Sequence, residues 1–313
     1  MEMDPHFKAH VDEQARVAAA NPAPPLGAIP PDMVRAGYRA QRTAQNANAP
    51  RDVETRDLQV AGADGPVAAR LYVPAGAEAT TPGLVYFHGG GFVIGDLETH
   101  DGHCRRLAAY AGMRVMAVDY RLAPEHPFPK GHDDALAATR WAFDHAAEIG
   151  FDPARIAVGG DSAGGNLAAS VSLDMRGDPQ RKLAFQLLLY PGIWPAQDTA
   201  SRQALDGPVL TKAAIAWFDE CLAAKGHPQS ARAWLGEAGD LAGAPPALVV
   251  TAGHDPLKDE GRDWAERLRA AGVDARHVEY PALVHDFFVM ADVSPAVDAA
   301  ARETAQALKA ALA

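Results

Sequence analysis

Gly160-Asp161-Ser162-Ala163-Gly164 follows the apolar run 156–158, and a stretch with helical character begins at Ala163. A G-x-S-x-G pattern between a buried strand and a helix forces its serine into a sharp turn. The flanking glycines remove side chains that would collide with neighbouring backbone. The serine oxygen then stands exposed beside a helix N-terminus, which favours negative charge. The pattern predicts a nucleophilic serine at position 162; the alternative is an idle serine in a glycine-rich turn.

Segments with strand and helix character alternate from about residue 55 onward. Two alternating segments flank Asp64-Gly65 and predict a hairpin, and near-continuous apolar runs predict strands buried on both faces. The expected strands lie at 57–62, 67–73, 84–87, 115–118, 156–158, 185–189, 247–250 and 277–280, and the expected helices at 133–147, 163–175, 258–271 and 295–312. This order predicts an α/β fold: a mostly parallel central sheet with an antiparallel start and helices on both faces.

Two regions interrupt this order. Residues 1–50 contain no strand pattern, but helices are expected at 11–20 and 31–44, which suggests an N-terminal helical arm. Residues 191–244 also lack a convincing strand and contain one expected helix at 212–224. We expect residues 51–190 and 245–313 to form the core. The insertion and the arm together are expected to form a cap over the carboxyl edge of the sheet.

Charge and composition exclude several partners. The 313 residues carry a formal net charge of −11, and a surface of that sign repels the phosphates of a nucleic acid. No apolar run is long enough to span a bilayer, and the first residues lack the pattern of a secretion signal. The two cysteines, Cys104 and Cys221, are too few for a disulfide framework. We therefore expect a cytoplasmic protein with no membrane or nucleic-acid partner.

A second glycine-rich segment, His88-Gly89-Gly90-Gly91, directly follows the expected strand 84–87. Three glycines allow backbone N–H groups to approach one point closely. Together with the N–H of Ala163, those groups are suited to binding the oxyanion of a tetrahedral intermediate. A phosphate-binding loop is the alternative, but neither G-K-[ST] nor G-x-G-x-x-G is present here.

A nucleophilic serine needs a base, and the base needs an acid that orients it. Asp255 lies just beyond the expected strand 247–250, and His285 lies in the segment after the last expected strand. The chain order Ser162, Asp255, His285 is the order that α/β-hydrolases use. The chain contains twelve histidines, and the position after the final strand selects His285.

Four ordered motifs resemble the bacterial hormone-sensitive-lipase-like family of α/β-hydrolase esterases. They are His88-Gly89-Gly90-Gly91-Phe92, the segment 120–129 (YRLAPEHPFP), the segment 160–166 (GDSAGGN) and the segment 255–260 (DPLKDE). The resemblance implies an α/β-hydrolase fold with a helical cap and a cofactor-free carboxylic ester hydrolase for short- to medium-chain acyl esters. It implies Ser162 as nucleophile, His285 as general base and Asp255 as its orienting acid. It further implies oxyanion donors at Gly89, Gly90 and Ala163.

The sequence departs from the family pattern beside the base. Family members commonly have His-Gly-Phe there, whereas this chain reads His285-Asp286-Phe287. The extra carboxylate either raises the pKa of the base or faces solvent. We expect Phe92, Trp194 and Phe287 to line the acyl pocket, and the segment 120–129 to support the glycine-rich turn from behind.

Several alternatives stay open at this point. His100-Asp101-Gly102-His103-Cys104 offers metal-binding side chains, but no second cluster accompanies it, so solvated polar residues are expected and no metal. An amidase, lactonase or deacetylase would use the same triad. A non-catalytic binder of small molecules is a further alternative, although such a protein need not keep His285. The expected partner is a small-molecule ester, and the family resemblance suggests a homodimer.

Overall fold

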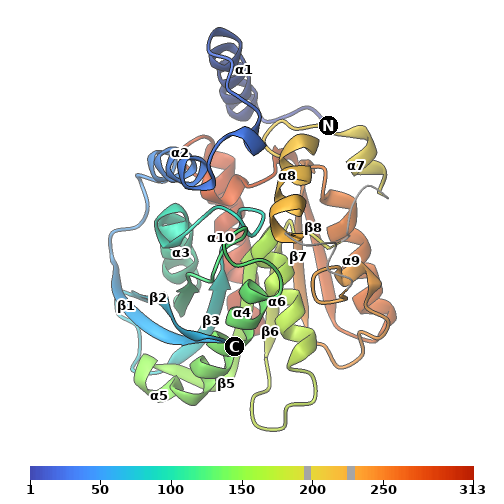
Figure 1. The fold of residues 1–313 in the computed structure, drawn as a ribbon. Coiled ribbons are helices and arrows are strands. Elements are labelled where there is room, and N and C mark those ends of the chain that lie inside the picture. Colours follow the sequence, from blue (N-terminus) through green and yellow to red (C-terminus); the bar gives the residue numbers. More distant parts are fainter. Residues whose placement is uncertain (194–198, 224–229) are drawn as a thin grey trace.

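The computed structural model describes residues 1–193, 199–223 and 230–313 (Figure 1). Within these ranges, eight strands form one sheet in the order β1-β2-β4-β3-β5-β6-β7-β8. The strands are β1 (Val53–Gly62), β2 (Gly65–Pro74), β3 (Thr81–Phe87), β4 (Arg114–Val118), β5 (Phe151–Asp161), β6 (Phe185–Leu189), β7 (Ala247–His254) and β8 (Ala275–Val284). The pairs β1–β2 and β2–β4 are antiparallel, and the remaining pairs are parallel. The expected sheet with an antiparallel start is confirmed.

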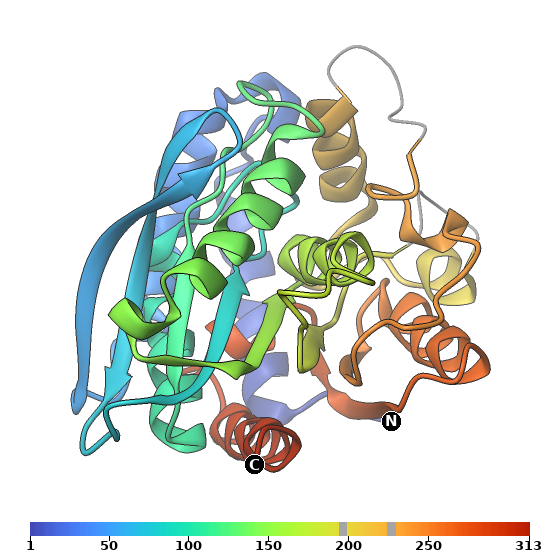
Figure 2. The same cartoon turned by 90° about the horizontal axis from the view of Figure 1, so that it is seen from below.

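Helices cover both faces of this sheet (Figure 2). On one face lie α3 (Leu97–Ala111) and α10 (Pro295–Ala311), and on the other lie α4 (Lys130–Asp144), α6 (Ala163–Asp174) and α9 (Lys258–Ala270). The helix expected at 133–147 is split, because α4 ends at Asp144 and the short α5 (Ala146–Ile149) follows. Gly150 ends α5 in the left-handed conformation, at φ 70°, which glycine adopts without strain.

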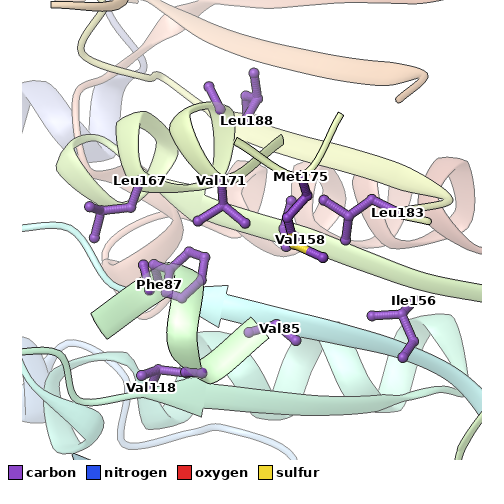
Figure 3. Close-up of a cluster of buried hydrophobic side chains, with 14 of the residues drawn as sticks. Val85, Phe87, Val118, Ile156, Val158, Leu167, Val171, Met175, Leu183 and Leu188 are labelled. Carbon is purple, nitrogen blue, oxygen red and sulfur yellow. The ribbon is translucent and has the colours of Figure 1, made fainter. Parts of the chain in front are cut away.

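The continuous apolar runs are explained by two separate cores. Successive residues of a strand point to opposite faces, so a strand covered on both faces needs apolar residues at every position. Val85 and Phe87 of β3 pack on the face of α6, where Leu167 and Val171 meet them (Figure 3). Leu84 and Tyr86 of the same strand join the core on the opposite face. Burial stabilises the fold by roughly 1.5–3 kcal/mol for each large apolar side chain.

The remaining helices lie at the carboxyl edge of the sheet (Figure 1). They are α1 (Pro5–Ala20) and α2 (Pro31–Ala44) from the first fifty residues, and α7 (Ala200–Ala204) and α8 (Lys212–Ala223) from the insertion. The helix α1 begins earlier than expected because the Asp4 carboxylate accepts the N–H groups of His6 and Phe7, and proline occupies the first turn. Across the described ranges, each helix is too short or too polar to cross a bilayer.

Candidate active site

Ser162 lies at the tip of a tight turn between β5 and α6. Its φ of 53° and ψ of −116° are strained for a residue with a side chain. The turn fits only because Gly160 and Gly164, two residues before and after Ser162, have no side chain. A Cβ on Gly160 would lie 2.3 Å from the carbonyl oxygen of Gly164, and a Cβ on Gly164 would lie 1.9 Å from the carbonyl oxygen of Phe87. The sequence GDSAG therefore forms the expected strand–turn–helix, and the turn presents the Ser162 hydroxyl at the carboxyl edge of the sheet.

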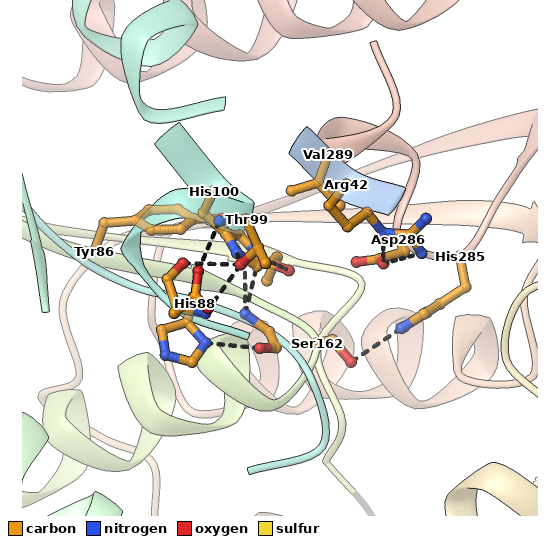
Figure 4. Close-up of polar contacts among 12 residues, drawn as sticks. Arg42, Tyr86, His88, Thr99, His100, Ser162, His285, Asp286 and Val289 are labelled. Carbon is orange, nitrogen blue, oxygen red and sulfur yellow. Dashed lines mark hydrogen bonds and ion pairs between the residues drawn. The ribbon is translucent and has the colours of Figure 1, made fainter. Parts of the chain in front are cut away.

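Three strand ends bring Ser162, His285 and Asp255 together, and Figure 4 shows His285 directed toward Ser162. His285 Nε2 lies 2.9 Å from Ser162 Oγ, and His285 Nδ1 lies 2.7 Å from Asp255 Oδ2. Asp255 is fully buried, and its other oxygen accepts the N–H of Leu257 at 2.8 Å. The carboxylate is thus held from both sides and can fix the orientation of the imidazole. A nucleophile, a base and an orienting acid in this line can carry out acyl transfer.

The surroundings of His285 set its protonation. Burial alone would lower the pKa of His285, but the carboxylates of Asp255 and Asp286 stabilise the imidazolium, and the net pKa is raised above its ordinary value. The imidazole is therefore a stronger base than a free histidine. It still has to be neutral before it can accept a proton from Ser162.

The glycine-rich loop after β3 corrects one prediction. The N–H of Gly89 donates to Asp161 Oδ1 at 3.1 Å, so this donor already serves an internal contact, and Gly89 does not line either cavity at Ser162. Gly90 and Gly91, both at positive φ, line a cavity together with Ser162. Gly91 was not among the expected donors, although the triple glycine was the signal that could have suggested it. Ala163 also borders a cavity at Ser162.

Asp161, next to Ser162, is the centre of a buried polar cluster, of which Tyr86 and His100 are labelled in Figure 4. Besides Gly89, its carboxylate accepts the Tyr86 hydroxyl at 2.6 Å and lies 3.2 Å from His100 Nε2. Burial opposes charge on His100, but the Asp161 carboxylate outweighs it and raises the pKa of this imidazole. The expectation that His100 and His103 are solvated is wrong, since both are buried. They face inward because α3 packs this side against the sheet.

The segment 120–129 supports the glycine-rich turn as expected. Tyr120 donates its hydroxyl to the carbonyl oxygen of His88 at 2.8 Å. Its ring stacks on the His88 ring, with 4.4 Å between centroids. Burial, together with the nearby His100, lowers the pKa of His88 to about 4, so His88 is a neutral packing group. These contacts fix the backbone at the start of the glycine run.

Two cavities meet at Ser162. The larger, of about 490 Å³, is lined by residues of α1, α2 and α8 as well as by Ser162 and His285. The smaller, of about 70 Å³, is bordered by Phe92, Ala163 and Trp234. Phe218 of α8 lies at both. The two cavities at Ser162 therefore differ strongly in volume.

Of the two expected acyl-pocket aromatic residues that the structure describes, Phe92 lies at a cavity beside Ser162 and Phe287 does not. Phe287 is completely buried and packs against Tyr190 and Phe288, so it does not line either cavity at the nucleophile and that expectation is wrong. It points inward because the loop after β8 turns at Asp286, at φ 68°. Trp194 lies outside the described residues.

Asp286, the residue that departs from the family pattern, is buried and does not face solvent. It accepts hydrogen bonds from Arg42 and Tyr38, both on α2. Local sequence carries no signal for these two partners, because 244 positions separate Arg42 from Asp286. Within the described residues, no three or more His, Cys, Asp or Glu side chains are grouped so that they could hold a metal ion.

The sheet order, the strained serine and the hydrogen-bonded histidine and aspartate define an α/β-hydrolase of the serine type. A family model described as alpha/beta hydrolase fold matches residues 84–289. The chain belongs to this family, within its hormone-sensitive-lipase-like esterases.

Known proteins are similar over most of their length. Esterase LipI of Mycobacterium tuberculosis is 44% identical over 261 residues, which cover 81% of each chain. Carboxylesterase NlhH of the same species is 40% identical over 291 residues, which cover 90% of this chain and 89% of the relative. The solved structure of an ester hydrolase from the metagenome of Lake Arreo superposes with a TM-score of 0.92 at 39% identity, and covers 98% of both chains.

Proposed function

We propose that Ser162, His285 and Asp255 hydrolyse carboxylic esters with short to medium acyl chains through an acyl-enzyme. The chain is a carboxylic ester hydrolase by its family. The observation that carries the assignment to these residues is the unbroken line of contacts from Asp255 through His285 to Ser162 Oγ, which ends at a cavity. Each contact is within hydrogen-bonding distance before any substrate is bound.

In the first half-reaction, Ser162 Oγ attacks the ester carbonyl carbon while His285 Nε2 takes the hydroxyl proton. The carbonyl oxygen becomes an oxyanion, and we assign its stabilisation to the backbone N–H groups of Gly90, Gly91 and Ala163, which border the cavities at Ser162. Collapse of the intermediate breaks the bond to the alcohol oxygen, and His285 returns the proton to that oxygen. The alcohol then leaves, and the acyl group stays on Ser162.

In the second half-reaction, a water molecule replaces the alcohol. His285 takes a proton from this water as it attacks the acyl carbon, and the same oxyanion site receives the charge. Proton return to Ser162 Oγ releases the carboxylic acid. The Asp255 side chain orients the ring and stabilises the imidazolium that forms twice in each turnover. No cofactor enters any of these steps.

The two cavities support a division of the substrate. The alcohol oxygen must receive its proton from His285 Nε2, so the alcohol group belongs in the larger cavity, which His285 lines. The acyl chain then belongs on the side of Phe92 and Trp234, where the space is small. Each added methylene gains about 0.8 kcal/mol only while apolar surface remains to bury it. The rate should therefore rise over a few carbons and then fall.

The arm and the insertion are proposed to act as a cap over this site. Tyr38 of α2 and Trp217 of α8 line the larger cavity, as does Val11 of α1. Without these helices the nucleophile would open to solvent on that side. In domain terms, residues 1–50 and 191–244 form the cap, and residues 51–190 and 245–313 form the catalytic core.

A series of p-nitrophenyl esters from acetate to palmitate tests the proposed substrate range. We expect kcat/KM of the purified protein to peak at a short or medium chain and to fall well before palmitate. Ser162→Ala serves as the control for background hydrolysis, and a matched anilide tests the amidase alternative. A maximum at palmitate, or a jump in rate once an emulsion forms, would contradict the proposal.

A cytoplasmic location and a homodimer complete the proposal. Cys104 and Cys221 are both free and buried, which suits a reducing compartment. The strand β8 stands at one end of the sheet, and an edge strand of this kind can pair with a second copy. Light scattering during size exclusion measures the oligomeric state, and a monomer at micromolar concentration would rule the dimer out.

A further inference from the structure

An ion pair joins the N-terminal arm to the loop that carries the base. Arg42 of α2 donates to Asp286 Oδ2 from Nε at 3.0 Å and from Nη2 at 2.7 Å. Tyr38, one helical turn earlier, donates its hydroxyl to the same oxygen at 2.9 Å. The Arg42 and Asp286 side chains point toward one another (Figure 4), and they are only 5% and 8% exposed. Three donor contacts thus converge on one carboxylate oxygen.

The Arg42–Asp286 pair lies directly beside His285 and Ser162. Asp286 is bonded through the backbone to His285, and it turns the chain at φ 68° before the short helix η3 (Phe287–Val289). Both members of the pair also line the larger cavity beside Ser162 and His285. A displacement of α2 would therefore have two effects together: it would remove the partner of Asp286 and change the lining of the larger cavity.

A buried carboxylate without a partner is unfavourable and acts strongly on neighbouring charges. Asp286 is among the groups that raise the pKa of His285. Arg42 offsets this effect because its cation lies in contact with the carboxylate. Burial alone would lower the pKa of the Arg42 guanidinium, but Asp286 and Tyr38 together outweigh burial and raise it, so Arg42 keeps its positive charge.

We propose that Arg42 is a positioning residue for the catalytic base: by pairing with Asp286 it fixes the loop of His285 and balances the adjacent carboxylate, so that the base is fully competent only while α2 is docked. The proposal rests on the role of His285 stated above. It makes the arm a part of the catalytic machinery as well as a wall of the pocket.

Other charges around the pair are the same in every variant needed for a test. Among the described residues, the titratable and charged groups facing His285 and Asp286 are Tyr38 and Arg42 from α2, His10 from α1, His100 and His103 from α3, Asp161 at the end of β5, Tyr190 after β6, and Asp255 after β7. If the midpoint of the pH profile changes only when the charge at position 42 or 286 is removed, the change can therefore be assigned to this pair.

The test compares the acidic limb of kcat/KM against pH in three variants of the full chain. Arg42→Gln leaves the negative charge of Asp286 without its partner, which stabilises the His285 imidazolium. The midpoint of the acidic limb should therefore lie about one pH unit higher than in the wild type. Asp286→Asn leaves the positive charge of Arg42 without its partner and should lower the midpoint pH of the acidic limb by a similar amount. Asparagine also tolerates the left-handed conformation at this position. The double variant removes both charges, and its limb should return close to the wild-type midpoint.

Arg39→Gln is the matched control. It removes a cation of the same helix, paired with Asp96 at 2.7 Å, without a contact to Asp286, and its limb should coincide with that of the wild type. The thermal unfolding temperature of each variant shows whether a loss of activity comes from unfolding or from a change at His285. Limbs that stay in place in both single variants, limbs that move in the same direction, or a change confined to KM would overturn the proposal.

Failure of this inference can be told apart from failure of the catalytic assignment. If His285→Ala keeps wild-type activity, His285 is not the base and the proposed function itself fails. If His285→Ala is inactive while the limbs of the Arg42 and Asp286 variants stay in place, only the role of Arg42 is lost. Opposite shifts that cancel in the double variant would establish it.

Discussion

Gly164 lies against Phe87 so closely that a Cβ at Gly164 would sit 1.9 Å from the Phe87 carbonyl oxygen. This contact packs the start of α6 onto the end of β3. It brings the nucleophile turn and the glycine-rich loop to the same edge of the sheet. The obstacle is backbone, so no side-chain rotation can relieve it. The distance between the Ser162 turn and the glycine-rich loop therefore depends on the absence of a side chain at Gly164.

Gly164→Ala should destabilise the protein and abolish activity. Inserting a methyl group into a close-packed site costs roughly 1–3 kcal/mol, and a clash with backbone lies at the upper end of that range. Gly37→Ala in α2 is the matched control, because nothing lies within 4 Å of its added Cβ. Alanine in place of a helical glycine should stabilise by roughly 0.5–1 kcal/mol. Urea unfolding measures both, and equal stability of the two variants would contradict this packing argument.

Ser162→Ala should lower kcat/KM by several orders of magnitude and leave the fold intact. The substitution removes one hydroxyl and no packing atom, so the loss belongs to the chemical step; removal of a triad nucleophile costs up to roughly 10⁶ in rate. A phosphonate that reacts with active serines should label the wild type and not the variant, as a mass shift on the peptide that contains residue 162. Retained activity above about a tenth of wild type would exclude Ser162 as nucleophile.

Activity should fall on the acidic side with a midpoint above the ordinary histidine value. The pKa of His285 is raised, since Asp255 and Asp286 together outweigh burial. Protonated His285 cannot accept the serine proton, so kcat/KM declines as pH drops through this raised pKa. The measurement is a pH profile of kcat/KM at constant ionic strength. A rate that stays flat well below about pH 6.5 would count against a histidine base.

Chelation should leave the rate unchanged. The proposed oxyanion donors are backbone N–H groups, and the proposed mechanism assigns no step to a metal ion. The wild type is assayed before and after prolonged dialysis against EDTA, with and without added zinc. Loss of activity that zinc restores would show a metal requirement that the mechanism above does not contain.

Much of the fold follows from local patterns in the sequence. The apolar runs at β3 to β7 are continuous because both faces of those strands are buried, and that requirement acts residue by residue. The turn at Ser162 was predictable for a similar reason, because a side chain at Gly160 or Gly164 would collide with neighbouring backbone. The extra length of α1 depends on the Asp4 cap, which is also a local feature.

The position of the triad was predictable for a different reason. Carboxyl ends of parallel strands meet at one edge of a sheet, so residues that follow β5, β7 and β8 come together even though they are far apart in the chain. Strand order alone thus places Asp255 and His285 near Ser162. The distances of 2.7 Å and 2.9 Å that join them come from the packed structure.

The sequence by itself therefore determined the sheet, the nucleophile turn and the order of the triad, because each depends on local periodicity or on strand ends. Only the tertiary structure decided where individual polar groups and rings point. It gave the N–H of Gly89 to Asp161, turned Phe287 into the core, and paired Asp286 with Arg42. Each outcome depends on which distant element packs against the residue, and no local pattern encodes a contact across 244 positions.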